Sequence, residues 1–146
     1  MDNDTPNSPD PGAEQERLER IAAHYGDEEA RVERRANLYA ARRAAEQVRG
    51  PDVLVCGAGT GVWTDTLLEK LERFETVDAV DGLVQALVAR HPERITGHVS
   101  LFEAFTPPRR YDSVVMGHVL EHVADPVAVL ARARGWLKPG GRVVIL

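Results

Sequence analysis

The heptapeptide GHVLEHV, residues 117–123, brings two histidines and a glutamate within five positions: His118, Glu121 and His122. On a helix, residues four apart share a face, so both imidazoles could bind one metal ion. The pattern H-x-x-E-H is also typical of one class of zinc proteases. That site needs a long helix and a third ligand well downstream, whereas Pro126 interrupts the segment and few residues follow. We therefore expect no metal at this motif.

The same histidines can also take part in acid–base chemistry. Because an imidazole titrates near neutral pH, His118 or His122 can accept a proton from a hydroxyl group. Alternatively, His122 is a packed residue whose ring nitrogens bond to backbone groups. The sequence leaves both interpretations open.

A glycine-rich stretch, residues 57–61 (GAGTG), predicts a ligand site. It follows the apolar run 53–56 and precedes a helical pattern. Glycines let the backbone turn sharply and approach a ligand, and the start of a helix offers free N–H groups. Asp81 is expected to end the next strand, where an acid accepts hydrogen bonds from ribose hydroxyls. Val62 stands where this loop departs from the dinucleotide pattern G-x-G-x-x-G, which favours a nucleoside with an amino-acid tail over NAD.

Strand and helix patterns alternate through the segment that carries these residues. The predicted strands are Val53–Cys56, Thr76–Val80, Gly97–Phe102, Asp112–Met116 and Arg142–Leu146. The predicted helices are Val62–Phe74, Leu83–Arg90 and Pro126–Leu137, the last with Asp125 as its N-cap. This alternation predicts an α/β fold, a Rossmann-like doubly wound parallel sheet covered on both faces.

The chain is predicted to have three parts. Residues 1–13 contain three prolines and three aspartates with almost nothing apolar, which predicts a disordered tail. Residues 14–50 are predicted to form a helical cap that breaks near Gly26-Asp27, with Asp27 capping its second helix. Residues 51–146 form the strand–helix domain. An apolar stripe at helical spacing marks the first cap helix, namely Leu18, Ile21, Ala22 and Tyr25.

Composition narrows the possible partners and location. The 146 residues are 43% hydrophobic and 28% charged, as in a soluble globular domain, and no apolar run is long enough to span a membrane. The net charge of −5 argues against a nucleic-acid partner. Cys56 is the single cysteine and is expected to be a buried apolar residue, which favours the reducing cytoplasm.

Four ordered motifs resemble those of class I S-adenosylmethionine-dependent methyltransferases: VLVCGAGTG, VDAVDG, RRYDSVVMGHVLEHVADP and LKPGGRVVIL. The HVLEHV-DP stretch most resembles the small-molecule branch that includes quinone-type O-methyltransferases, and residues 14–50 are similar to that family's N-terminal cap. The family commonly has seven strands, so this chain is expected to lack the last two and to end within strand five. A strand near an open sheet edge predicts association between copies of the chain.

The resemblance implies a cofactor, a reaction and a set of site residues. S-adenosylmethionine is the implied cofactor, and a small molecule is the implied methyl acceptor. The implied cofactor-binding residues are Gly57, Ala58, Gly59, Asp81, Gly82, Leu83, Glu103, Gly117 and His118. The implied catalytic residues are His118 and His122. A cofactor-binding fragment or pseudoenzyme without catalytic activity is the alternative.

Overall fold

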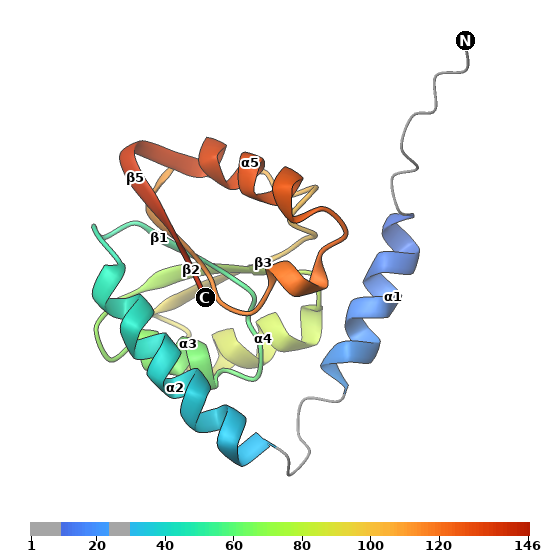
Figure 1. The fold of residues 1–146 in the computed structure, drawn as a ribbon, viewed down its shortest axis with the longest axis horizontal. Helices are drawn as coiled ribbons and strands as arrows, with labels where there is room; N and C mark the ends of the chain where they lie inside the picture. Colours follow the sequence, from blue (N-terminus) through green and yellow to red (C-terminus); the bar gives the residue numbers. More distant parts are fainter. Residues whose placement is uncertain (1–9, 24–29) are drawn as a thin grey trace.

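The computed structural model describes residues 10–23 and 30–146, which form a five-stranded sheet with helices on both faces (Figure 1). All neighbouring strands pair in parallel, in the order β3-β2-β1-β4-β5. The strands are β1 (Val53–Cys56), β2 (Phe74–Asp78), β3 (Ile95–Val99), β4 (Tyr111–Met116) and β5 (Leu137–Ile145). The predicted α/β doubly wound fold is therefore confirmed.

The helices divide between the two faces of the sheet. They are α1 (Pro11–Ala22), α2 (Ala30–Gln47), α3 (Val62–Leu67), α4 (Asp81–Arg90) and α5 (Pro126–Trp136), with a 3-10 turn η1 (Leu120–His122). In Figure 1, α2, α3 and α4 lie on one side of the sheet and α5 on the other, while α1 stands apart at one end. The expected N-cap of α5 is confirmed, because Asp125 accepts a hydrogen bond of 2.9 Å from the backbone N–H of Ala128.

The core has two layers because the central strands are buried on both faces. Val53 and Val55 of β1 pack with side chains of α2, α3 and α4. Leu54 and Cys56 point the other way and pack with side chains of α5. Successive residues of a strand face opposite sides, so a strand buried on both faces needs an unbroken apolar run. Burial also raises the pKa of the Cys56 thiol, as expected for a packing residue and not a nucleophile.

The structure corrects the boundaries around β2. The predicted helix Val62–Phe74 ends at Leu67, and β2 begins at Phe74 and ends at Asp78, not Val80. Arg94 explains the early end of α3, because its guanidinium donates hydrogen bonds of 2.8 Å each to the carbonyls of Leu68 and Leu71. These carbonyls are satisfied without further helical turns, so the chain is free to enter the sheet.

Other boundaries also differ from the sequence-based predictions, since β3 ends at Val99, not Phe102, and α4 begins at Asp81, not Leu83. Helix α1 begins at Pro11 with Asp10 as its N-cap, so three residues of the predicted tail are helical. The rest of that tail, Tyr25 and the proposed cap Asp27 lie outside the described residues. Strand β3 begins at Ile95, two residues earlier than predicted. Strand β5 begins at Leu137, five residues earlier than predicted, because the chain passes through a bulge opposite β4, with Gly140 at φ 77°.

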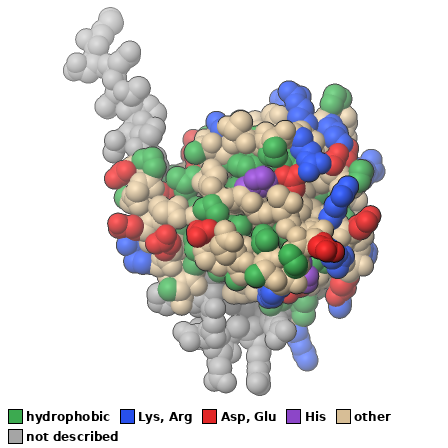
Figure 2. Space-filling view, turned by 180° about the vertical axis from the view of Figure 1, so that it is seen from behind, with side chains coloured by type: hydrophobic (Ala, Val, Ile, Leu, Met, Phe, Trp, Pro, Cys, Tyr) green, Lys and Arg blue, Asp and Glu red, His purple; other side chains and the backbone are tan. Residues whose placement is uncertain are grey.

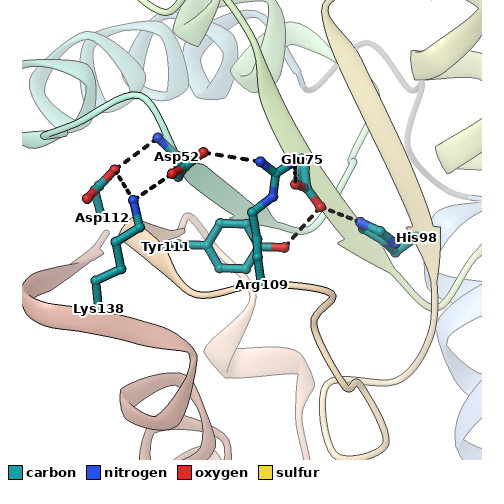
Figure 3. A network of polar contacts seen from close by, with 7 residues as sticks. All are labelled: Asp52, Glu75, His98, Arg109, Tyr111, Asp112 and Lys138. Atoms are coloured by element: carbon teal, nitrogen blue, oxygen red, sulfur yellow. Dashed lines mark hydrogen bonds and ion pairs between the residues drawn. The ribbon is translucent and has the colours of Figure 1, made fainter.

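A polar cluster around Glu75 joins the strands on the face of the sheet covered by α5 (Figure 3). The Glu75 side chain is only 8% exposed. Its carboxylate accepts hydrogen bonds from His98 Nε2 at 2.7 Å and from the Tyr111 hydroxyl at 3.0 Å, and Arg109 pairs with it at 2.5 Å. Three partners compensate for the burial of one carboxylate, so the cluster links side chains of β2, β3 and β4 across the sheet.

A second set of charged residues lies beside this cluster and connects β5 with the residue before β1. Lys138 Nζ lies 2.5 Å from an oxygen of Asp52 and 3.0 Å from one of Asp112. The backbone N–H of Asp52 also donates to Asp112 at 3.0 Å. The Lys138 ammonium lowers the pKa of the Asp52 carboxyl. These contacts hold the start of β4 and the bulged start of β5 together.

The surface of the described residues mixes charges of both signs. Figure 2 shows basic, acidic and hydrophobic side chains scattered over one face. Strand β5 forms one edge of the sheet, with Ile145 and Leu146 exposed by 48% and 41%. Association between copies through this edge stays a prediction. Within the described ranges, no helix has the length and apolar character needed to cross a membrane.

Candidate functional site

The glycine loop after β1 adopts a conformation that favours glycine. Gly57, Gly59 and Gly61 have φ values of 91°, 54° and 94°, in the left-handed region. A Cβ at position 57 would lie 2.6 Å from Cγ1 of Val119, in the segment after β4. The loop and the end of β4 therefore touch, and they form two walls of the same cavity.

Asp78 holds this loop in place from the end of the neighbouring strand. One carboxylate oxygen accepts a hydrogen bond of 2.7 Å from the backbone N–H of Ala58, and the other accepts one of 2.9 Å from Val80. The N–H of Gly57 donates to the carbonyl of Val77 at 2.8 Å. Each oxygen of Asp78 retains a free lone pair that can accept a bond from a ligand hydroxyl.

A cavity of about 230 Å³ opens at the carboxyl ends of β1, β2 and β4, the place where open α/β sheets bind ligands. Its wall combines backbone of the glycine loop with apolar and polar side chains. The principal lining residues are Glu14, Leu18, Ile21, Asn37, Gly57, Gly59, Trp63, Asp78, Leu83, Phe102, Glu103, Gly117, His118 and His122. A mainly apolar cavity with a few convergent polar groups is typical of a small-molecule site.

Helix α1 crosses this cavity and contacts both sides of it. Gln15 donates a side-chain hydrogen bond to the carbonyl of Ala79, just after β2. Arg17 donates to the carbonyl of His122 in η1 and also pairs with Glu14 at 2.8 Å. The predicted apolar stripe of this helix contributes to the cavity wall. The helix thus shields the cavity from solvent.

The end of β4 places His118 at the cavity in a strained conformation. Its φ of 55° is the one positive value for a non-glycine residue in the described chain. Its ring lies edge-on to the ring of Trp63, 6.5 Å between centroids, and its Nδ1 lies 3.7 Å from a carboxylate oxygen of Glu121. Strained backbone of this kind is concentrated at functional sites, where surrounding contacts maintain it.

Most of the predicted site residues meet at this one cavity. Gly57, Gly59, Leu83, Glu103, Gly117, His118 and His122 all line it. Ala58 is buried behind the loop and takes part through its backbone N–H. Gly82 lies in the first turn of α4, away from the wall.

The expectation that Asp81 ends the second strand is wrong. Asp81 is the first residue of α4, its side chain is exposed, and it accepts a hydrogen bond of 3.1 Å from Gln85. Asp78 holds the strand-end position and lines the cavity. A sequence signal for this assignment exists, because Asp78 stands closer than Asp81 to the spacing of about 20 residues after the first glycine.

The H-x-x-E-H motif does not form the helix that a zinc protease requires. Only Leu120–His122 make one 3-10 turn, and His118 precedes it with its left-handed backbone. The i, i+4 arrangement that would align the two imidazoles is therefore not formed. Among residues 10–23 and 30–146, no three side chains of His, Cys, Asp or Glu are grouped as metal ligands.

A family model described as a methyltransferase domain matches residues 54–143, which include β1 through most of β5. The chain belongs to the class I S-adenosylmethionine-dependent methyltransferases. A ubiquinone biosynthesis O-methyltransferase from Nitrosospira multiformis is 28% identical over 102 residues, which cover 66% of this chain and 43% of that protein. This methyltransferase chain thus spans less than half the length of that relative.

Solved structures agree with the methyltransferase fold. The N-methyltransferase NodS from Bradyrhizobium japonicum, in complex with S-adenosylhomocysteine, has a TM-score of 0.76 at 19% identity, covering 90% of this chain and 71% of NodS. The DhpI-SAM-HEP complex has a TM-score of 0.70 at 28% identity, covering 94% of this chain and 66% of DhpI. The resemblance to this family inferred from the four sequence motifs is confirmed.

Proposed function

We propose that this domain binds S-adenosylmethionine in the cavity and transfers its methyl group to a small-molecule acceptor. The observation that supports this most is the pairing of Asp78 with the glycine loop. A carboxylate at the tip of β2 and the left-handed glycines after β1 line one cavity, linked by the 2.7 Å bond from the N–H of Ala58. A ribose diol and an amino-acid tail require those two features side by side.

The proposed roles follow from position in the wall. Asp78 takes the role first expected of Asp81 and accepts hydrogen bonds from the ribose hydroxyls. Leu83 packs against the adenine, and Glu103, an exposed residue of the wall, accepts from the adenine amino group. Gly57 and Gly59 leave room for the amino-acid tail to pass close to the backbone. With these roles, the cofactor occupies the part of the cavity next to the end of β2. The part next to the end of β4 is left for the methyl acceptor.

His118 and His122 are the proposed proton acceptors on that side. When bound, S-adenosylmethionine supplies an electrophilic methyl group: the acceptor's lone pair forms the new bond to carbon as the carbon–sulfur bond breaks and leaves its electrons on sulfur. An acceptor hydroxyl or amine must also lose a proton, and both imidazoles line the cavity. Neither ring of these histidines has a hydrogen bond to the described backbone, which favours the acid–base interpretation over simple packing for His122.

Helix α1 has a proposed role in positioning and water exclusion. Its contacts with Ala79 and His122 hold it across the cavity opening. Aligning a donor and an acceptor in a closed site can remove up to about 7–11 kcal/mol from a bimolecular barrier. Leu18 and Ile21 of this helix form part of the cavity wall, which supports its proposed role in excluding water.

Calorimetry tests the binding step. The chain is titrated with S-adenosylmethionine, with S-adenosylhomocysteine and, as a control, with NAD. We expect saturable binding of both sulfur nucleosides and none of NAD, because the loop lacks the dinucleotide spacing. Absence of binding to both sulfur nucleosides at millimolar concentration would contradict the proposed function.

A methyl-transfer assay separates the enzyme from the alternative of a cofactor-binding protein without activity. The assay follows formation of S-adenosylhomocysteine with panels of phenols, amines and quinols. Turnover with any panel supports the methyltransferase, and binding without turnover supports the alternative. We also propose a cytoplasmic location, on the basis of the single buried cysteine.

A further inference from the structure

Trp63 of α3 has a buried hydrogen-bond donor without a partner. Its indole Nε1 is closed to solvent and makes no hydrogen bond in the described structure. The ring itself lines the cavity and packs against Gly117, where an added Cβ would lie 2.4 Å from Cζ2 of the indole. Buried N–H groups without partners are rare in native structures and cost stability. We therefore look for a ligand group that accepts a hydrogen bond from the indole N–H of Trp63.

The charges around the cavity restrict what this donor can bind. Glu14, Asp78 and Glu103 place three carboxylates in the wall, and no lysine or arginine among the described residues lines it. Arg17 of α1 pairs with Glu14 and donates to a backbone carbonyl. Arg90 of α4 lies against the glycine loop at Gly61, where it pairs with Asp65 and donates to the carbonyl of Thr60. A ligand carboxylate inside this cavity would thus meet no lysine or arginine in the described wall. Neutral N–H donors are the groups left to compensate its charge.

Position connects Trp63 with the amino-acid tail of the cofactor. The glycine loop touches the segment after β4 through Gly57 and Val119, and Trp63 lies on Gly117 in the same segment. A tail that passes over Gly57 therefore runs toward the indole. Gly117 lies next to the indole N–H, since an added Cβ there would be 2.9 Å from Nε1, so a small shift of this segment would open the donor to the ligand.

We propose that Trp63 is a positioning residue whose indole N–H donates a hydrogen bond to the carboxylate of the cofactor's amino-acid tail. This inference rests on the proposed binding of S-adenosylmethionine. The bond fixes the end of the tail at the glycine loop, where the loop meets the segment after β4, and so fixes the direction of the carbon–sulfur bond. An oxygen of the methyl acceptor is the other ligand group with suitable chemistry, and the experiment distinguishes the two.

The test compares two ligands that differ in the tail. S-adenosylhomocysteine carries the carboxylate, and 5′-methylthioadenosine is a related thioether nucleoside without it. In Trp63→Phe, which keeps an aromatic ring but removes the N–H, we expect S-adenosylhomocysteine to bind about 10- to 100-fold more weakly. The affinity for 5′-methylthioadenosine is expected to stay within about twofold, because the nucleoside contacts are unchanged. Calorimetry gives both constants.

Trp136→Phe is the matched control, because Trp136 is the chain's other tryptophan and, as the last residue of α5, packs in the opposite layer of the core. We expect this variant to bind both ligands as the parent chain does. It also leaves Trp63 as the single tryptophan, so its fluorescence reports the indole directly. S-adenosylhomocysteine is expected to shift that emission, and 5′-methylthioadenosine is expected to leave it unchanged.

Four outcomes are decisive. Selective loss of S-adenosylhomocysteine affinity in Trp63→Phe supports the carboxylate contact. Equal weakening of both ligands would assign Trp63 to packing alone and overturn the proposal. Unchanged affinity for both, with a raised KM for any phenol, amine or quinol that is turned over, would assign the N–H to the acceptor and also overturn it. If the parent chain binds neither ligand, the proposed function fails before the role of Trp63 is reached.

Discussion

Replacing Asp78 by Asn is the most direct test of how the site is built, and Asp81→Asn is its matched control. Both changes remove one negative charge and preserve side-chain size. Asp78 lies at the cavity, bonded to the N–H groups of Ala58 and Val80. Asp81 lies three residues further on, exposed, and accepts from Gln85. General electrostatic effects should therefore be similar, and only the local geometry differs.

The expected magnitude follows from the hydrogen bonds that Asp78 makes. A hydrogen bond to a charged group contributes about 1.5–3 kcal/mol. In Asn, one carboxylate oxygen is replaced by an NH2 group, which cannot accept a hydrogen bond from a backbone N–H or from a ribose hydroxyl. At least one hydrogen bond to the charged carboxylate is therefore lost. The bond to the remaining oxygen is weakened, because that oxygen no longer carries a charge. The sum is about 2–4 kcal/mol, which corresponds to a loss of affinity for S-adenosylhomocysteine of about 30- to 1000-fold. Asp81→Asn is expected to change that affinity less than about threefold.

Calorimetry measures the affinities, and thermal unfolding verifies that both variants are folded at the assay temperature. The Asp78 variant is expected to unfold at a lower temperature, because the N–H of Ala58 or Val80 loses its partner. Strong loss in Asp81→Asn with normal binding in Asp78→Asn would refute the corrected assignment. Normal binding in both would refute the idea that a carboxylate at this edge holds the ribose.

Three further perturbations test other parts of the structure. Gly117→Ala should displace the indole packed against it and weaken S-adenosylhomocysteine binding about tenfold, measured by calorimetry. Tyr111→Phe should cost about 1–2 kcal/mol in urea unfolding at neutral pH, since Glu75 loses a donor. Burial raises the pKa of Tyr111, so the parent chain should lose stability as pH rises above about 10, whereas the variant should lose less. Because Lys138 lowers the pKa of Asp52, that pair's contribution should vanish as pH falls below about 4, and Lys138→Met should flatten this acid dependence.

The sequence predicted the elements whose ends are marked by strong local signals. Strand β1 is a short apolar run followed at once by glycines, and both its bounds were correct. Helix α5 has Asp125 and Pro126 at its start, a pairing that fits only the first turn of a helix. The segment that carries His118 followed the predicted strand β4 as expected. In each case the local chemistry alone determines where the element begins or ends.

Local propensity did not determine the end of β2, because two acids compete for it and only the spacing after the first glycine favours Asp78. In the stretch VDAVDG, Asp78 and Asp81 each follow an apolar residue, and local propensity does not distinguish them. Pairing with β3 decides, since Phe74 lies opposite Ile95 and Asp78 opposite Val99. Arg94, distant in the sequence, also bonds to the carbonyls of Leu68 and Leu71 just after α3. Long-range contacts of this kind leave no local pattern to read.

The bulge in β5 was missed for a related reason. Pro139, Gly140 and Gly141 are typical turn residues, and local chemistry favours a turn. The structure keeps them in the strand because Lys138 is held by Asp52 and Asp112 beside the start of β4. The pairing then resumes with Arg142 opposite Ser113.

Stabilising charges and ligand-binding groups occupy different regions of this fold. The Glu75 cluster lies on the face of the sheet covered by α5, and the contacts of Lys138 lie where β1, β4 and β5 begin (Figure 3). In both places each charged group is paired with groups of opposite charge. The cavity at the carboxyl ends instead keeps the free lone pairs of Asp78, the unpaired N–H of Trp63 and the strained His118. A protein can maintain such costly features only if other interactions stabilise the scaffold. Variants of the Glu75 cluster should therefore lower stability and spare affinity, whereas cavity variants should lower affinity with smaller losses of stability.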